Sequence, residues 1–442
     1  MTENFSISMH RPDSLAGAVT AFEGIKNSAA LVNGPNGCRT YLSYLTGIQD
    51  AQTTPLGLDK YFTDIYFQRV PSTFLDEYDY VNSAEEKLTT AINQISNFDY
   101  DLVGIINSPG TSLIGDDLIA ILKKSSPKYK TVPIESSCFT GTFVDGFKRA
   151  SNEILKAVIE NDGPKIPKSV NLIGANIFQY NWESDTAEIK RTLELIGIKV
   201  ISKICAGETL ENLKMANRAE LNVVLYEEYG NTIAQQLEHD YGTPYMGIKE
   251  SSPYGFVSSE IWFGKIADFF NLPKTMINEE SNKVKMKCYR TLDRISVLMG
   301  GLRGIRFGYF GDSSTAVPLI SFLHKYLGLY PDVIGLREVG PENQKLLNQY
   351  IAENSLDTTI LYSPDQYDIR EALSDKKPDL IYGSNVEDRV SRGVPDAKFG
   401  FIPFTYPYYD QVSLTFRPLI GFNGVLTILE DTLNTLKAIQ QP

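Results

Sequence analysis

The sequence contains few of the residues that would support a disulfide scaffold or a histidine-based metal site. Its 442 residues include four cysteines, which are far apart and form no CxxC pair, and three histidines without HxxxH spacing. A disulfide-rich fold and a mononuclear zinc site are therefore not indicated. In a reducing compartment we expect the cysteines to be buried thiols or metal ligands.

Long apolar runs and an excess of basic residues are also missing. No stretch reaches the roughly 18 apolar residues needed to span a bilayer, and the N-terminal segment lacks the pattern of a secretory signal. With 42 basic against 54 acidic residues the formal charge is −12, which disfavours binding to nucleic acid and to anionic membranes. We expect a cytoplasmic protein with neither kind of partner. Because no Walker A sequence is present, ATP hydrolysis by this chain is not indicated.

Short β-branched segments alternate with helical segments from about residue 28 to the end of the chain. This alternation predicts an α/β fold with mainly parallel sheets flanked by helices. A chain of this length exceeds one hydrophobic core, and the Gly- and Pro-containing segment 161–169 interrupts the pattern. We therefore expect three Rossmann-like domains, at residues 1–165, 166–285 and 286–442, the last closed by a C-terminal helix.

The segment LVNGPNGCR is the most informative for chemistry, because a buried strand ends there in a Gly-rich turn before a helix. The turn places Cys38 near the helix N-terminus, where backbone amides and the neighbouring Arg39 are expected to lower the thiol pKa. Gly34 and Gly37 would let the backbone approach a bulky inorganic ligand. The alternative is that Cys38 is a small apolar core residue. The turn favours a thiolate ligand.

A second cysteine, Cys138, also stands at the carboxyl end of a predicted strand. In an open parallel sheet such strand ends meet at one crevice, so Cys138 and Cys38 could face the same space. Between them the segment NSPGTSLIGDD follows another strand. We expect its Asp116 and Asp117 to cap the following helix start rather than to act as an acid/base pair.

The order of these segments resembles component 1 of nitrogenase and its relatives over nearly the whole chain. GPNGC resembles the cluster-cysteine turn of that family, SPGTSLIGDD resembles a segment that often carries another cluster cysteine, and YVNSAEEKL and ESSCFTGTFVDGF also match in order. LNVVLYEEYGNTI and FGFIPFTYPYYD follow at the expected places. The resemblance implies an iron–sulfur cluster at a subunit interface.

Departures from the family pattern limit what the resemblance implies. Pro109 stands where catalytic subunits have a cluster cysteine, and Tyr226 stands where they have the cysteine of the active-site metal cofactor. An iron–molybdenum-type cofactor is therefore not expected. The resemblance leaves Cys38 as the inherited cluster ligand, and Cys138, placed close to the cluster, as an additional candidate ligand.

The number of thiolates implies a partner chain, since a [4Fe-4S] cluster usually takes four such ligands. Either two copies each contribute Cys38 and Cys138, or a sister subunit contributes three ligands and Cys38 one. The resemblance also implies an ATP-dependent iron–sulfur reductase as electron donor and a small-molecule or tetrapyrrole-type substrate. The alternatives are a scaffold on which a metallocluster is assembled and a noncatalytic structural subunit. Cys205 and Cys288 are expected to pack apolar surfaces.

Two further groups have both a functional and a structural interpretation. Tyr226, Glu227 and Glu228 close a predicted strand and would face a cleft between domains, or else serve as helix-start caps and surface charge. The aromatic run 403–410 would line a pocket for a flat or apolar substrate, or else pack between domains. The sequence leaves both pairs of alternatives open.

Overall fold

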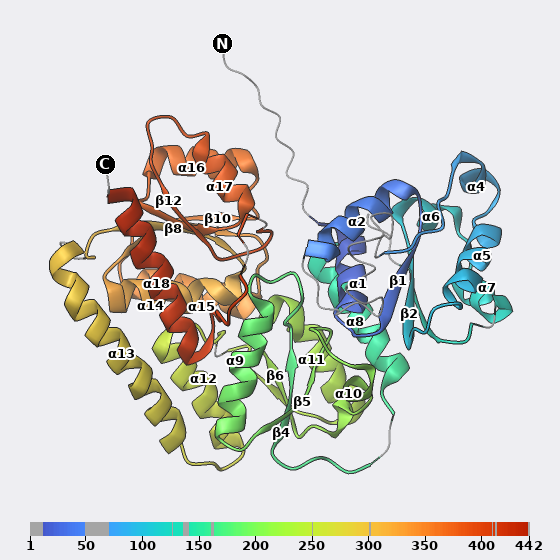
Figure 1. Cartoon of the computed structure of the whole chain (residues 1–442), viewed down its shortest axis with the longest axis horizontal. Coiled ribbons are helices and arrows are strands. Elements are labelled where there is room, and N and C mark those ends of the chain that lie inside the picture. Colours follow the sequence, from blue (N-terminus) through green and yellow to red (C-terminus); the bar gives the residue numbers. More distant parts are fainter. Residues whose placement is uncertain are drawn as a thin grey trace.

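The computed structural model describes residues 12–48, 70–125, 127–135, 141–160, 163–249, 251–299, 302–408, 410–411 and 413–440. Within these residues the chain forms three units, each built on a parallel sheet flanked by helices (Figure 1). The predicted α/β fold with parallel sheets is thus confirmed. Among the described helices, none combines the length and the apolar character needed to cross a membrane.

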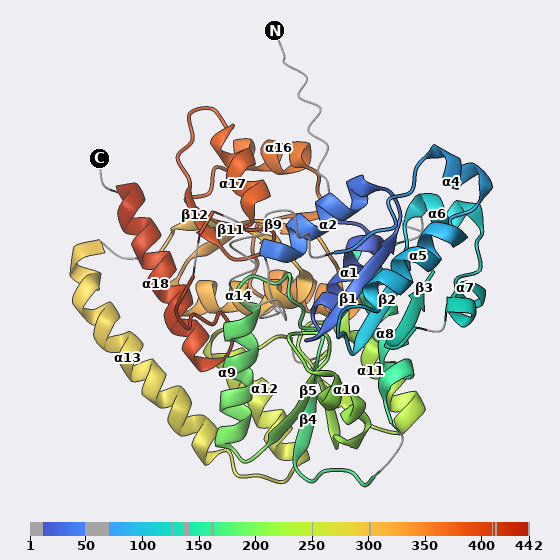
Figure 2. The same ribbon diagram turned by 45° about the vertical axis from the view of Figure 1, so that its right-hand side comes forward.

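The first sheet has the strand order β1-β2-β3, and Figure 2 shows these strands side by side. The strands are β1 (Ser28–Asn33), β2 (Leu102–Asn107) and β3 (Lys130–Ile134). Every residue of β1 and β2 is buried, as expected for parallel strands covered on both faces. Alternate side chains enter opposite cores, because Ala29 and Leu31 pack in one apolar cluster and Ala30 and Val32 in another.

Helices cover both faces of this sheet. They are α1 (Ser14–Glu23), α2 (Asn36–Ile48), α4 (Glu77–Asn82), α5 (Glu85–Ile95), α6 (Pro109–Ile114), α7 (Leu118–Ser125) and α8 (Phe143–Val158). α1 and α8 touch backbone to backbone, since a side chain at Gly17 or Gly146 would overlap a carbonyl oxygen of the other helix. α8 also contacts α11 (Glu227–Tyr241) of the second unit and so joins the two units.

The second sheet has the order β5-β4-β6-β7. Its strands are β4 (Ser169–Ile173), β5 (Lys199–Lys203), β6 (Leu221–Val224) and β7 (Tyr245–Met246). Its helices are α9 (Trp182–Leu195), α10 (Leu210–Lys214), the 3-10 turn η1 (Ala216–Arg218), α11 (Glu227–Tyr241) and α12 (Gly255–Phe269). α11 ends at Gly242, whose φ of 64° lies in the left-handed region that glycine adopts without strain.

A continuous helix, α13 (Thr275–Met299), leads to the third sheet, so the boundary expected between residues 285 and 286 falls inside a helix. The strand order is β10-β9-β8-β11-β12. The strands are β8 (Arg306–Gly311), β9 (Tyr330–Leu336), β10 (Thr359–Tyr362), β11 (Leu380–Gly383) and β12 (Gly400–Pro403). The helices are α14 (Ser313–Leu327), α15 (Pro341–Glu353), α16 (Gln366–Lys376), α17 (Asn385–Arg392) and α18 (Gly421–Gln440). α18 returns to pack on α9, α12 and α13, which ties the third unit to the second.

Candidate functional site

Cys38 lies in the first turn of α2, directly beyond the carboxyl end of β1. Its side chain is half-buried and packs at the margin of the main apolar core. The predicted strand, turn and helix are therefore all present around this residue. Such a position at the end of a parallel strand is where α/β folds commonly bind ligands.

The expected lowering of the Cys38 pKa is wrong. Burial raises the pKa of the Cys38 thiol, the carboxylate of Asp13 raises it further, and a backbone hydrogen bond opposes both effects. Arg39 is not among the groups that shift this pKa, and its guanidinium lies 4.7 Å from the centre of the Phe74 ring. The Nε atom of Arg39 is buried and has no hydrogen-bond partner among the described residues.

The two glycines of the turn have different surroundings. A side chain at Gly34 would come within 2.7 Å of Ser108, so this glycine lets the turn after β1 pack against the turn after β2. None of the described residues has an atom within 4 Å of the position that a side chain at Gly37 would take. Among the described residues, packing within the chain therefore explains Gly34 but not Gly37.

Pro109 is the first residue of α6, where a proline is tolerated because the missing N–H would have no helical partner. The preceding Ser108 is buried, and Thr111 donates a hydrogen bond from Oγ1 to the Asn33 carbonyl oxygen at 2.8 Å. The turn that resembles a cluster-binding segment is thus fixed next to Cys38. Its residue 109 supplies no ligand atom from its side chain.

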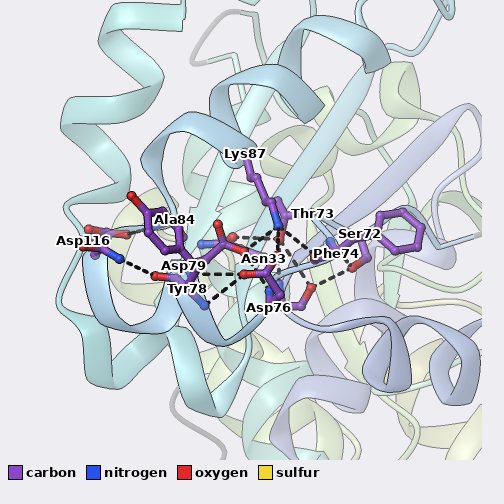
Figure 3. A network of polar contacts seen from close by, with 12 residues as sticks. Asn33, Ser72, Thr73, Phe74, Asp76, Tyr78, Asp79, Ala84, Lys87 and Asp116 are labelled. Atoms are coloured by element: carbon purple, nitrogen blue, oxygen red, sulfur yellow. Dashed lines mark hydrogen bonds and ion pairs between the residues drawn. The ribbon is translucent and has the colours of Figure 1, made fainter.

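A buried polar network fixes the segment after residue 70 to the end of β1 (Figure 3). Asn33 donates from Nδ2 to Asn107 Oδ1 at 3.0 Å and accepts from Thr73 Oγ1 at 3.0 Å. Thr73 Oγ1 also accepts from the Gly34 N–H at 2.9 Å, and Ser72 Oγ donates to the Gly34 carbonyl at 2.8 Å. Because these groups are buried and paired, the backbone beside Cys38 is held in one position.

The short helix α4 is fixed by charged groups at its start (Figure 3). Asp76 and Asp79 form a capping box, and Lys87 pairs with Asp76 at 2.9 Å and with Asp79 at 2.6 Å. A capping box satisfies amide donors that a helix start leaves unpaired. This explains how a helix as short as α4 keeps a defined place beside α6.

Asp116 and Asp117 both accept hydrogen bonds at helix starts. Asp117 caps the following helix, as expected, whereas Asp116 bonds at the start of α5, a helix that precedes it in the chain. Asp117 accepts from the Ala120 N–H at 3.0 Å at the start of α7. Asp116 accepts from Ser83 Oγ at 3.0 Å and from the Ala84 N–H at 2.8 Å, just before α5. Neither is placed as a general acid or base.

Large apolar side chains are exposed on α2, which carries Cys38, on α4 and α6, and on the segment that leads to α4. Tyr78 is 74%, Val81 82% and Leu113 75% exposed, and Phe74 and Tyr41 are exposed to lesser degrees. We call these five side chains the Cys38 face. Apolar side chains gathered in this way mark surfaces that bind other proteins. The sequence analysis missed this face, although the apolar residues of the short acidic helix EYDYVN were a signal for it.

The other cysteines do not join this site among the residues that the structure describes. Cys138 lies outside the described residues. Cys205 and Cys288 are buried elsewhere, and burial raises the pKa of Cys205 to about 12 and that of Cys288 to about 11. In the described part of the chain, no group of three or more His, Cys, Asp and Glu side chains could hold a metal ion. The described residues thus provide one thiol at the candidate site.

Tyr226 is buried at the end of β6, with its hydroxyl 3.0 Å from that of Tyr254. Glu228 is buried as well, and its carboxylate accepts from the Ser314 N–H at 2.7 Å and from the hydroxyls of Ser313 and Ser314. These groups begin α14 of the third unit. Glu228 therefore caps a helix of another unit rather than facing an open cleft.

Glu227 acts in the same way on α15. It accepts from the backbone N–H groups of Glu342 at 3.1 Å and Asn343 at 2.9 Å, and from Asn343 Nδ2 at 2.8 Å. Of the two interpretations of these residues, the structural one predicted helix capping together with exposed charge. The capping is observed, but the predicted exposure is wrong because both carboxylates are buried.

The aromatic run 403–410 packs between the units. The Tyr406 ring is 5.7 Å from that of Phe143 in the first unit and 5.9 Å from that of Phe178 in the second. Phe404 is buried against Tyr254, with ring centres 5.8 Å apart. The described members of the run thus favour interdomain packing over a substrate pocket.

Comparison with known proteins assigns the chain to a family. The family model described as nitrogenase component 1 type oxidoreductase matches residues 14–437. This chain belongs to that family. The family resemblance stated above is therefore confirmed.

Several relatives in this family are similar over most of their length. The chain is 25% identical over 391 residues to the nitrogenase iron–molybdenum cofactor biosynthesis protein NifE of Methanococcus maripaludis, covering 87% of this chain and 77% of that protein. It is 23% identical over 388 residues to a light-independent protochlorophyllide reductase subunit of Nostoc punctiforme, covering 84% and 74%. It is 22% identical over 460 residues to the nitrogenase molybdenum–iron protein beta chain of Methanococcus maripaludis, covering 95% and 92%.

Among solved structures, the one described as nitrogenase Cp1 at pH 6.5 matches with a TM-score of 0.79 at 19% identity. The match covers 97% of this chain and 92% of that chain. At this identity the likeness shows a shared fold.

Proposed function

We propose that this chain is a subunit of a nitrogenase-like reductase in which Cys38 ligates an iron–sulfur cluster at a subunit interface. The observation that carries the proposal is the position of Cys38, a half-buried thiol beyond a strand end beside the exposed apolar Cys38 face. A cluster ligand at an interface has to be within reach of a second chain, and the apolar side chains provide a surface for that chain. Membership of an oxidoreductase family supports the same function.

The donor set fits a shared cluster. A [4Fe-4S] cluster usually takes four thiolate-like ligands, and the described residues provide Cys38 alone at this site. The remaining ligands come from a second copy, with Cys138 of each chain included, or from a cysteine-rich sister subunit. The unpartnered Nε of Arg39 beside Cys38 is a donor that an anionic ligand or a partner's acceptor would satisfy.

Bound at this position, the cluster would accept and pass on single electrons. An ATP-dependent iron–sulfur reductase is the proposed electron donor. The chain's own contribution is to hold the Cys38 sulfur at a fixed place, since the Asn33 network and the capped α4 fix the backbone around it. In this proposal, the electrons that leave the cluster reduce a small-molecule or tetrapyrrole-type substrate. One relative is by name part of a protochlorophyllide reductase.

A second candidate function is a scaffold on which a metallocluster is assembled. The similarity to a protein named for cofactor biosynthesis favours it. The two functions differ in the fate of the cluster. A reductase keeps its cluster through many turnovers, whereas a scaffold transfers metal to an acceptor protein.

The test is anaerobic purification of the full chain together with the sister subunit that co-purifies with it, or alone if none does. Iron and sulfide analysis and low-temperature electron paramagnetic resonance are then applied to the wild type, Cys38→Ala and the control Cys288→Ala. We expect an iron–sulfur signal in the wild type and in the control, and its loss in Cys38→Ala. A wild type without iron and sulfide, or a Cys38→Ala variant with a full complement, would overturn the proposal.

A further inference from the structure

A cavity of about 380 Å³ lies in the third unit at the carboxyl end of α14. Basic and aromatic side chains line it together, from the last turn of α14, from the segment before β8 and from the start of β9. They are Arg303, His324, Lys325, Tyr326 and Tyr330. No Asp or Glu is among the described residues that line it. A cavity of this size accommodates a small molecule.

The helix end accounts for only part of this basic character. Cations near a helix C-terminus interact favourably with the helix dipole, and His324 and Lys325 are in the last turn of α14. The carbonyl of His324 is already paired there, because it accepts from the N–H of Gly328 at 3.1 Å. Arg303 comes from a different segment and crosses over Gly328, where a built side chain would lie 2.9 Å from the Arg303 Cγ. Helix capping therefore does not explain Arg303.

The two permanent cations of the cavity form no ion pair with any described residue. Lys325 instead has its Nζ atom 5.1 Å from the centre of the Tyr350 ring. The carboxylate of Asp332, two residues after the start of β9, is paired with Arg306 at 2.6 Å. An arginine and a lysine that line one cavity repel each other unless an anion lies between them.

His324 adds a neutral group to the same cavity. Burial and the charge of Lys325 lower the pKa of His324, so the imidazole is uncharged near neutral pH. Its Nδ1 atom lies 2.9 Å from the Tyr350 hydroxyl oxygen. When that hydroxyl donates to Nδ1, the ring proton is on Nε2, which can then donate to a ligand.

We propose that this cavity binds the oxyanion group of a small phosphorylated molecule. A phosphate group carries roughly 1.5 to 2 negative charges near neutral pH and offers several acceptor oxygens, which suit the donors of Arg303 and Lys325. Tyr326, which is 39% exposed, and Tyr330 provide ring surface for the rest of such a molecule. Because the cavity is in the third unit and Cys38 is in the first, this inference does not depend on the proposed function.

Isothermal titration calorimetry of the full chain with phenyl phosphate, near neutral pH and at low ionic strength, tests the site. Arg303→Gln and Lys325→Gln each remove one positive charge from the cavity. Lys345→Gln is the matched control, because it removes one charge from α15 at a side chain that is 71% exposed and paired with Glu342. We expect one phenyl phosphate per chain in the wild type and the control. Each cavity variant should bind about tenfold more weakly, since it loses a charge-assisted hydrogen bond.

Two further titrations identify what the cavity recognises. Arg303→Lys keeps the charge and should bind more tightly than Arg303→Gln, which separates recognition from any loss of folding. Inorganic phosphate should bind more weakly than phenyl phosphate because it lacks the ring, and equal affinity would overturn the assignment to a phosphorylated molecule.

Other results would overturn the site itself. They are a wild type that does not bind phenyl phosphate, and unchanged affinity in both Arg303→Gln and Lys325→Gln. An equal loss of affinity in Lys345→Gln would also overturn it, because net charge rather than the cavity would then govern binding.

Discussion

Glu228→Ala is predicted to destabilise the protein strongly although the residue is far in sequence from the candidate site. The Glu228 carboxylate is buried between the second and third units and accepts three hydrogen bonds at the start of α14, from the hydroxyls of Ser313 and Ser314 and the Ser314 N–H. Alanine removes the acceptor and leaves these donors without it. Both serines are at most 1% exposed, so water does not replace the carboxylate without a rearrangement.

The magnitude follows from those donors. A buried donor left unsatisfied costs about 1–3 kcal/mol, and the two hydroxyls can rotate toward other acceptors whereas the backbone N–H cannot. Loss of an N-terminal cap costs about 1 kcal/mol in addition. Burial raises the pKa of Glu228, so removal of the carboxylate also relieves a desolvation cost. The net loss of unfolding free energy is about 3 kcal/mol.

Thermal unfolding, followed by the fluorescence of the buried Trp182 and Trp262, measures this loss. For a cooperative unit of about 150–250 residues, 1 kcal/mol shifts Tm by about 2–4 °C, so Glu228→Ala should lower Tm by roughly 6–12 °C. Glu228→Gln keeps one acceptor oxygen and should lie between this variant and the wild type. Glu342→Ala, at a partly exposed carboxylate paired with Lys345 on α15, is the control and should leave Tm unchanged.

A Glu228→Ala variant that unfolds within about 2 °C of the wild type, while the same measurement resolves other variants, would contradict the predicted loss of stability. It is also refuted if Glu342→Ala lowers Tm as much as Glu228→Ala. That result would mean that the loss of any carboxylate from this region has the same effect, whatever its burial and partners.

Four further predictions concern the candidate site. Cys38→Ala should lose most of the bound iron, measured by iron and sulfide analysis, because no other described thiol lies at this site. Cys288→Ala should leave the visible spectrum unchanged, since that thiol is buried on α13. If two copies of the chain each supply two ligands, Cys138→Ser should lower the iron content and shift the midpoint potential. If a sister subunit supplies three ligands, the same change should leave both quantities nearly unchanged. Val81→Asp should weaken the association with the second chain, measured by analytical size-exclusion chromatography, because it places a charge on an apolar side chain of the Cys38 face that is 82% exposed.

These predictions have separate contrary outcomes. Full iron content in Cys38→Ala would mean that the cluster is not bound at Cys38. Loss of colour in Cys288→Ala would mean that Cys288 belongs to the cluster site. A silent Cys138→Ser variant in a protein that purifies without any partner would contradict both ligand-sharing schemes. Unchanged association in Val81→Asp would mean that the second chain binds away from the Cys38 face.

The sequence alone determined the fold class and the position of Cys38. Strand and helix periodicities are local, so the alternation of β-branched and helical segments was sufficient to predict an α/β fold with parallel sheets. The turn before Cys38 is equally local, because a buried strand, two glycines and a helix start follow one another directly. The cap formed by Asp117 depends on residues next to it in the chain. The burial of Cys205 was expected from its residue type.

The tertiary structure decided what depends on contacts between distant segments. Glu228 accepts a hydrogen bond from Ser314, which is 86 residues away in the sequence. No local pattern indicates that this carboxylate caps a helix of another unit. The pKa of Cys38 was predicted in the wrong direction because burial outweighs the helix amides, and burial is a property of the packed chain. Gly34 serves packing because Ser108, which directly follows strand β2, lies against it. Side-chain periodicity encodes which face of an element is apolar, but the partner of that face is set only when the chain has folded.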